Sequence, residues 1–431
     1  MSRSRRGRFA TVATALAALG VGIAACSNSK VHVSSGGAAP GVTPTEINVG
    51  SIANITGPLS SDFAPVVNGV QAYFSMINAE GGVAGRHINL AFQTDDQGSS
   101  TTDLTVAQKL VEQDHVFAVV GVGTPFFGGA TYLASQGTPT FGYVVSSDWS
   151  NKPTLFGDFS SVLDFAAGAP GDGYIAQQLG AQSIGVIAYG VPQSAAACQA
   201  AATGMRGFGL NVSFVDLNFP FGGDATADTL QMKAHNVDLM FSCLDVTGSV
   251  AFARAINQNG LTMHQLWFNG YDRGTLDQYA PIMTGVYLGL QHVPFEAALR
   301  FPGVYPGLTT YIQQMQKYQP KYTYSETALD GWVAAAQFVA GLKAVGKNLT
   351  QKRLVAAINA EKAFTGDGLT TPVDWSTAHT VAVPPFCQAT VQVQGGQFVP
   401  AFVQGTSQVF TCFGSKTSTT PVPPPPHTPG L

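Results

Sequence analysis

The chain has 431 residues, of which 45% are hydrophobic and only 11% are charged, with 25 acidic against 21 basic side chains. This composition excludes an intrinsically disordered chain, and the slightly acidic balance excludes a nucleic-acid-binding protein. The length exceeds what one hydrophobic core usually serves, so we expect two lobes.

Residues 1–25 are predicted to be an export signal. Four arginines precede an apolar stretch at 9–25, which is marginal in length for a bilayer span. The stretch ends in Ile23-Ala24-Ala25-Cys26, a pattern typical of bacterial lipoproteins, in which Cys26 becomes the first mature residue and carries a diacylglyceryl group. The alternative is an ordinary cleavage site beside an incidental cysteine. The pair Arg5-Arg6 leaves the export route open.

Loss of the signal leaves 17 basic against 25 acidic residues, a balance of −8. Residues 26–45 are rich in Ser, Gly, Ala and Pro without periodicity, so they are predicted to be a flexible tether.

Residues 46–96 are predicted to form a strand, a loop, a helix, a turn and a second strand. The first strand alternates at 47–52, and the turn residues at 54–59 end it. Apolar residues then recur at helical spacing from Asp62 to Ile77, until Gly81 and Gly82 stop the helix. The second strand, at 88–92, leads to the acidic pair Asp95-Asp96.

Three short segments of this unit occur in an order that few proteins share: TGPL at 56–59, INAEGGVAGR at 77–86 and DDQG at 95–98. Together they resemble the start of the leucine/isoleucine/valine-binding proteins, the type I solute receptors of bacterial ABC importers. The resemblance covers roughly residues 46–413. It implies an α/β fold of the periplasmic binding protein-like I (Venus-flytrap) type, with two doubly wound parallel-sheet lobes, a hinge of three crossovers and a solute cleft between the lobes.

The rest of the chain alternates between strands and helices in two sets, which predicts two parallel sheets with right-handed crossovers. The first set includes strands at 116–120 and 139–143, and the second begins near residue 171. The resemblance implies that the helices at 309–318 and 326–342 return to the first lobe, and that a hairpin at 386–403 joins the second. We therefore expect lobe 1 at 46–160 and 281–362, lobe 2 at 161–280 and 363–414, and a disordered or extended Pro-rich tail at 415–431.

Four cysteines remain in the mature chain: Cys198, Cys243, Cys387 and Cys412. An even number in an oxidising compartment predicts disulfides. Among the three possible pairings we favour the local pairs, Cys198 with Cys243 and Cys387 with Cys412. We expect no metal site, because no CxxC or HxxxH spacing occurs and the eight histidines are scattered.

Nine residues that follow predicted strands are candidate ligand-binding residues, since the cleft of such a fold faces the carboxyl ends of the strands. They are Thr56, Gly123, Thr124, Tyr143, Tyr189, Asp245, Thr247, Tyr271 and Asp272.

Different chemistry is expected of different candidates. Thr56 could bind a carboxylate or simply belong to a turn, and Gly123 and Thr124 could bind an anion at a helix start or simply cap that helix. Asp245 is placed to receive an ammonium group, with a solvated loop acid as the alternative. The resemblance implies that Tyr189 lines the ligand or faces a cation.

The other candidates depend on features of this chain. Amino-acid-binding members of the family commonly have small hydroxyl residues after the third strand, where this chain has Pro125-Phe126-Phe127. An aromatic wall is therefore expected, although both phenylalanines could equally be core, and the ring of Tyr143 suits the cleft. Tyr271 or Asp272 could close over the solute, and Asp272 could instead cap a helix.

No catalytic residue or cofactor is predicted. Asp95 and Asp96 follow a strand and suit support of a turn or hinge better than acid/base work. Residues 341–348 nearly match a phosphate-binding loop, but they close a helix and have Asn348 where Ser or Thr should stand. There is no GxSxG motif, which leaves a secreted hydrolase without support.

We therefore expect a lipid-anchored protein, not an enzyme, on the extracytoplasmic face of the bacterial membrane. It would act as a monomer, bind a branched-chain or other amino acid or a related amide or aromatic acid, and deliver it to ABC permease subunits. The alternative is a ligand-sensing ectodomain that signals to a membrane partner.

Overall fold

A computed structural model describes residues 39–57, 59–163 and 169–431. The predicted signal, Cys26 and most of the tether lie outside the described residues. The end of the tether, at 39–45, is not flexible as predicted but belongs to the fold. Val42 forms a β-bridge with Ile47, and the backbone N–H of Asn48 donates to the carbonyl of Gly41.

The first lobe contains a five-stranded sheet with the order β2-β1-β3-β4-β5, in which all strands are parallel. Its strands are β1 (Glu46–Ala53), β2 (His87–Asp95), β3 (Val119–Gly123), β4 (Thr140–Gly142) and β5 (Leu155–Gly157). Every residue of β3 is buried, as a parallel sheet covered on both faces requires.

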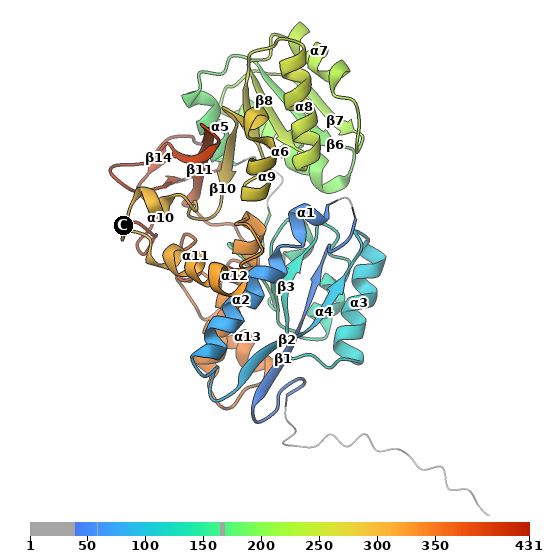
Figure 1. The fold of residues 1–431 in the computed structure, drawn as a ribbon, viewed down its shortest axis with the longest axis vertical. Helices are drawn as coiled ribbons and strands as arrows, with labels where there is room; N and C mark the ends of the chain where they lie inside the picture. Colours follow the sequence, from blue (N-terminus) through green and yellow to red (C-terminus); the bar gives the residue numbers. More distant parts are fainter. Residues whose placement is uncertain (1–38, 58, 164–168) are drawn as a thin grey trace, which may run out of the picture. The chain divides into compact units, whose positions relative to one another are not determined.

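Helices cover both faces of this sheet (Figure 1). One face carries α3 (Ser100–Glu112) and α4 (Ala130–Ser135), and the other carries α2 (Val66–Ala79) and α12 (Glu326–Val345). The later helices α11 (Pro306–Tyr318) and α13 (Gln351–Asn359) pack against α2 and α12. The chain therefore returns to the first lobe after the second, as the resemblance implied.

The first predicted helix is broken in two. A short helix, α1 (Ser60–Phe63), is followed by Ala64 and Pro65, and α2 then begins at Val66. Proline lacks a backbone N–H and suits a helix start better than a helix interior. The break leaves Asp62 and Phe63 in the segment that follows β1.

The second lobe contains a nine-stranded sheet, in the order β14-β13-β11-β10-β9-β8-β6-β7 with β12 paired to β11. The five strands β6 to β10 are parallel to one another. The strands β11 to β14 form antiparallel pairs, and β11 also pairs antiparallel with β10. Their bounds are β6 (Ile184–Tyr189), β7 (Val212–Phe219), β8 (Leu239–Cys243), β9 (His264–Trp267), β10 (Tyr287–Leu290), β11 (Phe386–Gln394), β12 (Gln397–Ala401), β13 (Phe410–Phe413) and β14 (Pro421–Val422). The hairpin β11–β12 thus joins the second lobe. The expected bounds of lobe 1, with a second part at 281–362, are wrong at their start, because β10 belongs to this second sheet.

One face of this sheet packs against α5 (Pro170–Gln178) and α6 (Pro192–Gly207). The other packs against α7 (Thr226–Ala234), α8 (Val246–Gln258) and α9 (Arg273–Met283). The short helices η1 (Ser147–Trp149) and α10 (Ala297–Arg300) lie in connections. No helix among the described residues is both long and apolar enough to cross a bilayer.

The structure contains both predicted disulfides. Cys198 on α6 is bonded to Cys243 at the end of β8, and Cys387 on β11 is bonded to Cys412 on β13. The second pair joins residues that lie opposite each other in the β11–β13 ladder. Local pairing was therefore the correct choice.

The expectation that the tail at 415–431 is disordered is wrong, whereas the alternative that it is extended holds for part of it. Residues Pro421–Val422 form β14, which pairs with β13. The Gln408 side chain donates to the carbonyl of Pro429, and Thr428 is buried. The prediction failed because proline removes only its own N–H donor, and such a segment can still pair at a sheet edge.

Candidate solute-binding site

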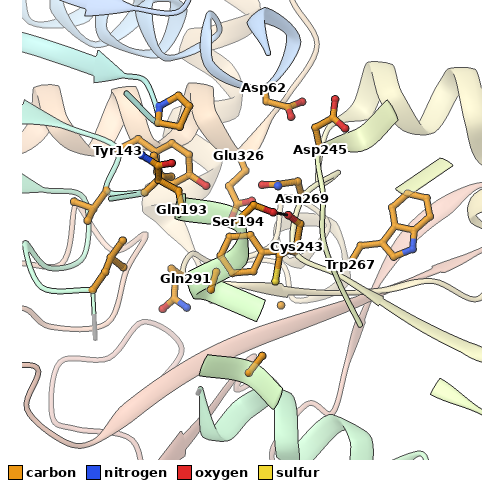
Figure 2. A pocket seen from close by; sticks show the side chains of 18 of the residues that line it. Asp62, Tyr143, Gln193, Ser194, Cys243, Asp245, Trp267, Asn269, Gln291 and Glu326 are labelled. Atoms are coloured by element: carbon orange, nitrogen blue, oxygen red, sulfur yellow. Dashed lines mark hydrogen bonds between the residues drawn. The ribbon is translucent and has the colours of Figure 1, made fainter. Parts of the chain in front are cut away.

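A cavity of about 300 Å³ lies at the carboxyl ends of the strands of both sheets. Segments that follow β1, β3, β4 and β5 contribute its walls from the first lobe, and segments that follow β6 to β10 contribute from the second. This is where doubly wound α/β sheets bind ligands, because the loops there are free to vary while the strands fix their ends. Figure 2 shows the side chains of 18 of the residues that line it.

Most of the lining is apolar, and aromatic rings dominate it: Phe63, Phe126, Tyr143, Phe159, Tyr189, Phe221, Phe241, Trp267 and Phe268. Several rings support one another. The Tyr189 ring stacks on Phe221 with a centroid distance of 4.0 Å, and Phe63 lies 6.0 Å from Tyr143. Phe221 and Phe268 remain 47% and 48% exposed, so both can cover a solute.

Five carboxyl side chains interrupt this apolar lining: Asp62, Asp158, Asp172, Asp245 and Glu326. Burial raises the pKa of Asp158 and of Asp172 to about 7 and the pKa of Glu326 to about 8. The uncharged polar groups are amides and a hydroxyl, from Gln193, Ser194, Asn269, Gln291 and Gln388. No lysine or arginine is among the described residues that line the cavity, and residues 58 and 164–168 contain none in the sequence.

Two of the carboxyl groups come from opposite lobes and face the same space. Asp62 on α1 and Asp245, the N-cap of α8, lie at one end of the cavity in Figure 2. Burial is the main cause that raises the pKa of Asp62 to about 7, and the charge of Asp245 adds to it. Asp245 Oδ1 accepts from the hydroxyl of Tyr189 and from the backbone N–H of Gly248 at 2.8 Å.

A buried cluster lies beside the cavity where the lobes are joined. His292 Nε2 is 3.1 Å from Asp330 Oδ1 and 3.6 Å from Asp158 Oδ2, and all three side chains are at most 3% exposed. Burial lowers the pKa of His292 to about 3 and raises the pKa of Asp330. One imidazole and two carboxylates could hold a divalent metal such as Zn²⁺. Spacing along the sequence gave no sign of this cluster, because its residues come from three distant segments.

Three of the nine candidate residues line the cavity: Tyr143, Tyr189 and Asp245. Tyr143 follows β4, Tyr189 ends β6, and Asp245 follows β8. Phe126, from the expected aromatic wall, also lines the cavity, whereas Phe127 is core and packs against Trp149.

The candidates at the ends of β1 and β3 lie outside the lining. Thr56 is exposed, and its hydroxyl and backbone N–H both donate to Asp95, so that carboxylate supports a turn as expected. The helix expected at Thr124 begins six residues later, at Ala130. Thr124 is fully buried and its Oγ1 accepts from the N–H of Phe126, so neither it nor Gly123 stands at a helix start.

The last three candidates also lie outside the lining. Thr247 is exposed on the first turn of α8. Tyr271 is buried, and its hydroxyl donates to Glu296 and accepts from the N–H of Phe295. Asp272 caps α9 through the N–H of Thr275 at 2.6 Å, which was the alternative reading of this residue. In this loop Phe268 and Asn269 line the cavity instead.

The other lining residues that sequence reasoning missed had weak signals. Asp62 and Glu326 were placed inside predicted helices, where a carboxylate usually faces water. Phe268 and Asn269 stand directly after a strand, so the rule that picked Tyr271 could have found them. Gln193 and Ser194 lie on the first turn of α6, which also follows a strand directly.

Two doubly wound lobes with a cavity at their facing strand ends define a solute-binding receptor of the Venus-flytrap type. The chain belongs to the periplasmic binding protein family, whose model matches residues 46–397. The resemblance inferred from the opening unit is therefore confirmed. No curated protein sequence matches the chain.

Solved structures share the fold at low identity. A fatty acid ABC transporter substrate-binding protein from Thermomonospora curvata has 18% identity and a TM-score of 0.71, over 88% of this chain and 95% of that one. A solute-binding protein from R. palustris in complex with benzoate has 17% identity and a TM-score of 0.68, over 86% and 99%. A leucine-binding protein from Thermotoga maritima has 14% identity and a TM-score of 0.68, over 82% and 97%.

Proposed function

We propose that the chain captures a small solute in the cavity between its lobes and delivers it to the permease subunits of an ABC importer. The cavity carries this proposal, because side chains of both lobes line one apolar space that also offers a few polar groups. A solute there would contact both lobes at once, so it would favour the arrangement in which they lie together. The structural neighbours that are named as transporter proteins support the same role.

The solute we expect from the resemblance is an amino acid or a related amide or aromatic acid. The aromatic lining supports a solute with an apolar body. The five carboxyl groups of the cavity, with no lysine or arginine among its described lining residues, argue against the members of this set that carry a carboxylate.

A thermal-shift screen of the purified protein against amino acids, amides, amines and aromatic acids tests the capture of a solute. A ligand at about 100 times its dissociation constant stabilises the folded state by about 2.7 kcal/mol. We expect Phe221→Ala and Phe268→Ala to lose most of that shift and to keep their own melting temperature, since both rings are half-exposed. The control Leu299→Ala removes a side chain that is 86% exposed and outside the lining. A shift that survives both phenylalanine variants would contradict binding in this cavity.

We further propose that the protein is held at the extracytoplasmic face of the membrane through a lipid on Cys26. The position of Cys26, directly after the apolar stretch, supports this. The wild-type protein should partition into the membrane fraction and incorporate labelled fatty acid, and Cys26→Ser should do neither. Membrane retention of Cys26→Ser would contradict the anchor.

Delivery to a permease and signalling to a sensor partner require the same capture step. The two roles can be distinguished by measuring uptake of the identified solute in cells that lack the gene for this protein. Uptake that falls in the mutant supports transport, whereas normal uptake would favour the ligand-sensing ectodomain.

A further inference from the structure

The ionisable groups that line the cavity are almost all acidic. Five carboxyl groups line it, and none of its described lining residues is a lysine or an arginine. His292 also lines it, but its Nε2 faces the carboxyl groups of Asp158 and Asp330 at 3.6 and 3.1 Å. A solute with a free carboxylate would therefore find no lysine or arginine among the described lining residues.

Backbone N–H groups are the other common partners of an anion, and in several of the loops that line the cavity they already have an acceptor. After β3, Pro125 has no N–H and the N–H of Phe126 donates to Thr124. After β4, the N–H of Tyr143 donates to the carbonyl of Val122, and the N–H of Val144 donates to Asp158.

The second lobe shows the same pattern. The N–H of Tyr189 donates to Ser194 Oγ at 2.8 Å. At the start of α8, where free amides and the helix dipole would attract an anion, the N–H of Gly248 already donates to Asp245, and the Asp62 carboxyl group lies beside the backbone of Val246. An anion buried there without partners would be strongly disfavoured.

A cation, in contrast, would find both carboxyl groups and aromatic rings to contact. Asp62 and Asp245 converge from the two lobes, and the charge of Asp245 adds to the cost of ionising Asp62, so a positive charge between them would offset this cost. Aromatic faces adjoin this position, since Tyr189 donates to Asp245 and stacks on Phe221. Such faces attract ammonium groups and also accept an apolar body.

We propose that the solute is a cationic amphiphile without a carboxylate, with a protonated amine held between Asp62 and Asp245 and an apolar body among the aromatic rings. This inference rests on the proposed capture of a solute. It separates this chain from the neighbours whose names specify fatty acid, benzoate or leucine, all of which carry a carboxylate.

Three probes with one apolar body and different ends test the inference: 4-phenylbutylamine, 4-phenylbutanol and 4-phenylbutyrate. Isothermal titration calorimetry of the purified protein should show the amine binding at least tenfold more tightly than the alcohol, and no binding of the acid. Because binding displaces protons from carboxyl groups with raised pKa, the heat of amine binding should also depend on the ionisation enthalpy of the buffer at pH 7.

Two variants test whether Asp62 and Asp245 hold the amine of the probe. Asp62→Asn and Asp245→Asn should each weaken amine binding at least tenfold and change alcohol binding less than threefold. Asp103→Asn, which alters a buried aspartate outside the lining, is the control and should change neither. If either variant unfolds, Asp62→Glu and Asp245→Glu keep the charge and should retain most of the affinity for the amine.

All titrations contain EDTA, because the Asp158–His292–Asp330 cluster could hold a metal. Preferred binding of the acid overturns the inference and leaves solute capture standing, and so does acid binding that appears only when Zn²⁺ replaces EDTA. Failure of all three probes to bind counts against the inference, whereas the proposed function is then decided separately by the wider thermal-shift screen.

Discussion

At the scale of single residues, buried carboxyl groups are the most distinctive chemistry of the chain. Asp103, which lies away from the cavity, shows that burial makes such a group harder to ionise. Its side chain is fully buried, Oδ1 accepts from the N–H of Gly129 at 2.7 Å, and burial raises its pKa to about 7. Between about pH 4 and about pH 7, a carboxyl group with this pKa holds a proton in the folded state but not in the unfolded state.

We therefore expect Asp103 to lower the free energy of unfolding as pH rises from about 4 to about 7, because the unfolded chain binds fewer protons in this window. Asp103→Asn keeps the acceptor for Gly129 and cannot ionise. Urea denaturation at pH 5 and pH 8 should show that the variant loses less stability than the wild type between the two, by about 2 kcal/mol. Equal losses would mean that Asp103 ionises normally.

Residue identity alone could predict some of the site. Tyr143, Tyr189 and Asp245 were found because each stands directly after a strand, where the fold places its ligands. Thr124 was misjudged because the helix after β3 begins only at Ala130, and a local sequence does not determine the length of such a loop. Asp62 was missed because its helix is interrupted by Pro65.

At the scale of elements, the packing of α2 against α12 fixes the first lobe. The two helices approach so closely that a glycine stands on each at the contact. A Cβ at Gly331 would lie 1.9 Å from the carbonyl oxygen of Val66, and one at Gly69 would lie 1.8 Å from the carbonyl oxygen of Ala328. Both neighbours are backbone atoms, so a rotamer change cannot relieve the overlap.

Gly331→Ala should accordingly destabilise the protein by about 3 kcal/mol, because the helices must separate to admit a methyl group. Gly207→Ala, at the end of α6, is the matched control. A Cβ there meets nothing within 4 Å, and the higher helix propensity of alanine should leave stability unchanged or raise it by about 0.5 kcal/mol. Thermal unfolding of both variants measures the difference, and similar melting temperatures would refute close packing at Gly331.

Most elements could be predicted from the sequence, since alternation and helical spacing report which side of an element is buried. The disulfides followed from their places on neighbouring elements. The Asp158–His292–Asp330 cluster could not be predicted, because its members are more than thirty residues apart along the chain and only the fold brings them together.

At the scale of the whole molecule, the cavity links the pH of the medium to the relation between the lobes. Asp62 belongs to one lobe and Asp245 to the other, and Asp245 and Asp272 are the charged groups that act on Asp62. Below about pH 7 Asp62 is largely neutral, and above it a second negative charge faces Asp245. Repulsion between them then opposes close approach of the lobes when no solute is bound.

Small-angle X-ray scattering of the ligand-free protein should show a radius of gyration that rises as pH increases through about 7. Asp62→Asn should flatten this rise, whereas Asp277→Asn, which alters an exposed aspartate on α9, should preserve it. An equal rise in Asp62→Asn would show that another group separates the lobes.

The short strand β14 has a consequence for how the protein behaves in concentrated solution. It covers the outer edge of β13, whose backbone donors and acceptors would otherwise be open to a strand from another molecule. A chain cut before Ser415 would expose that edge and should self-associate over time. We therefore expect the proline-rich end to limit aggregation by covering this edge of the sheet.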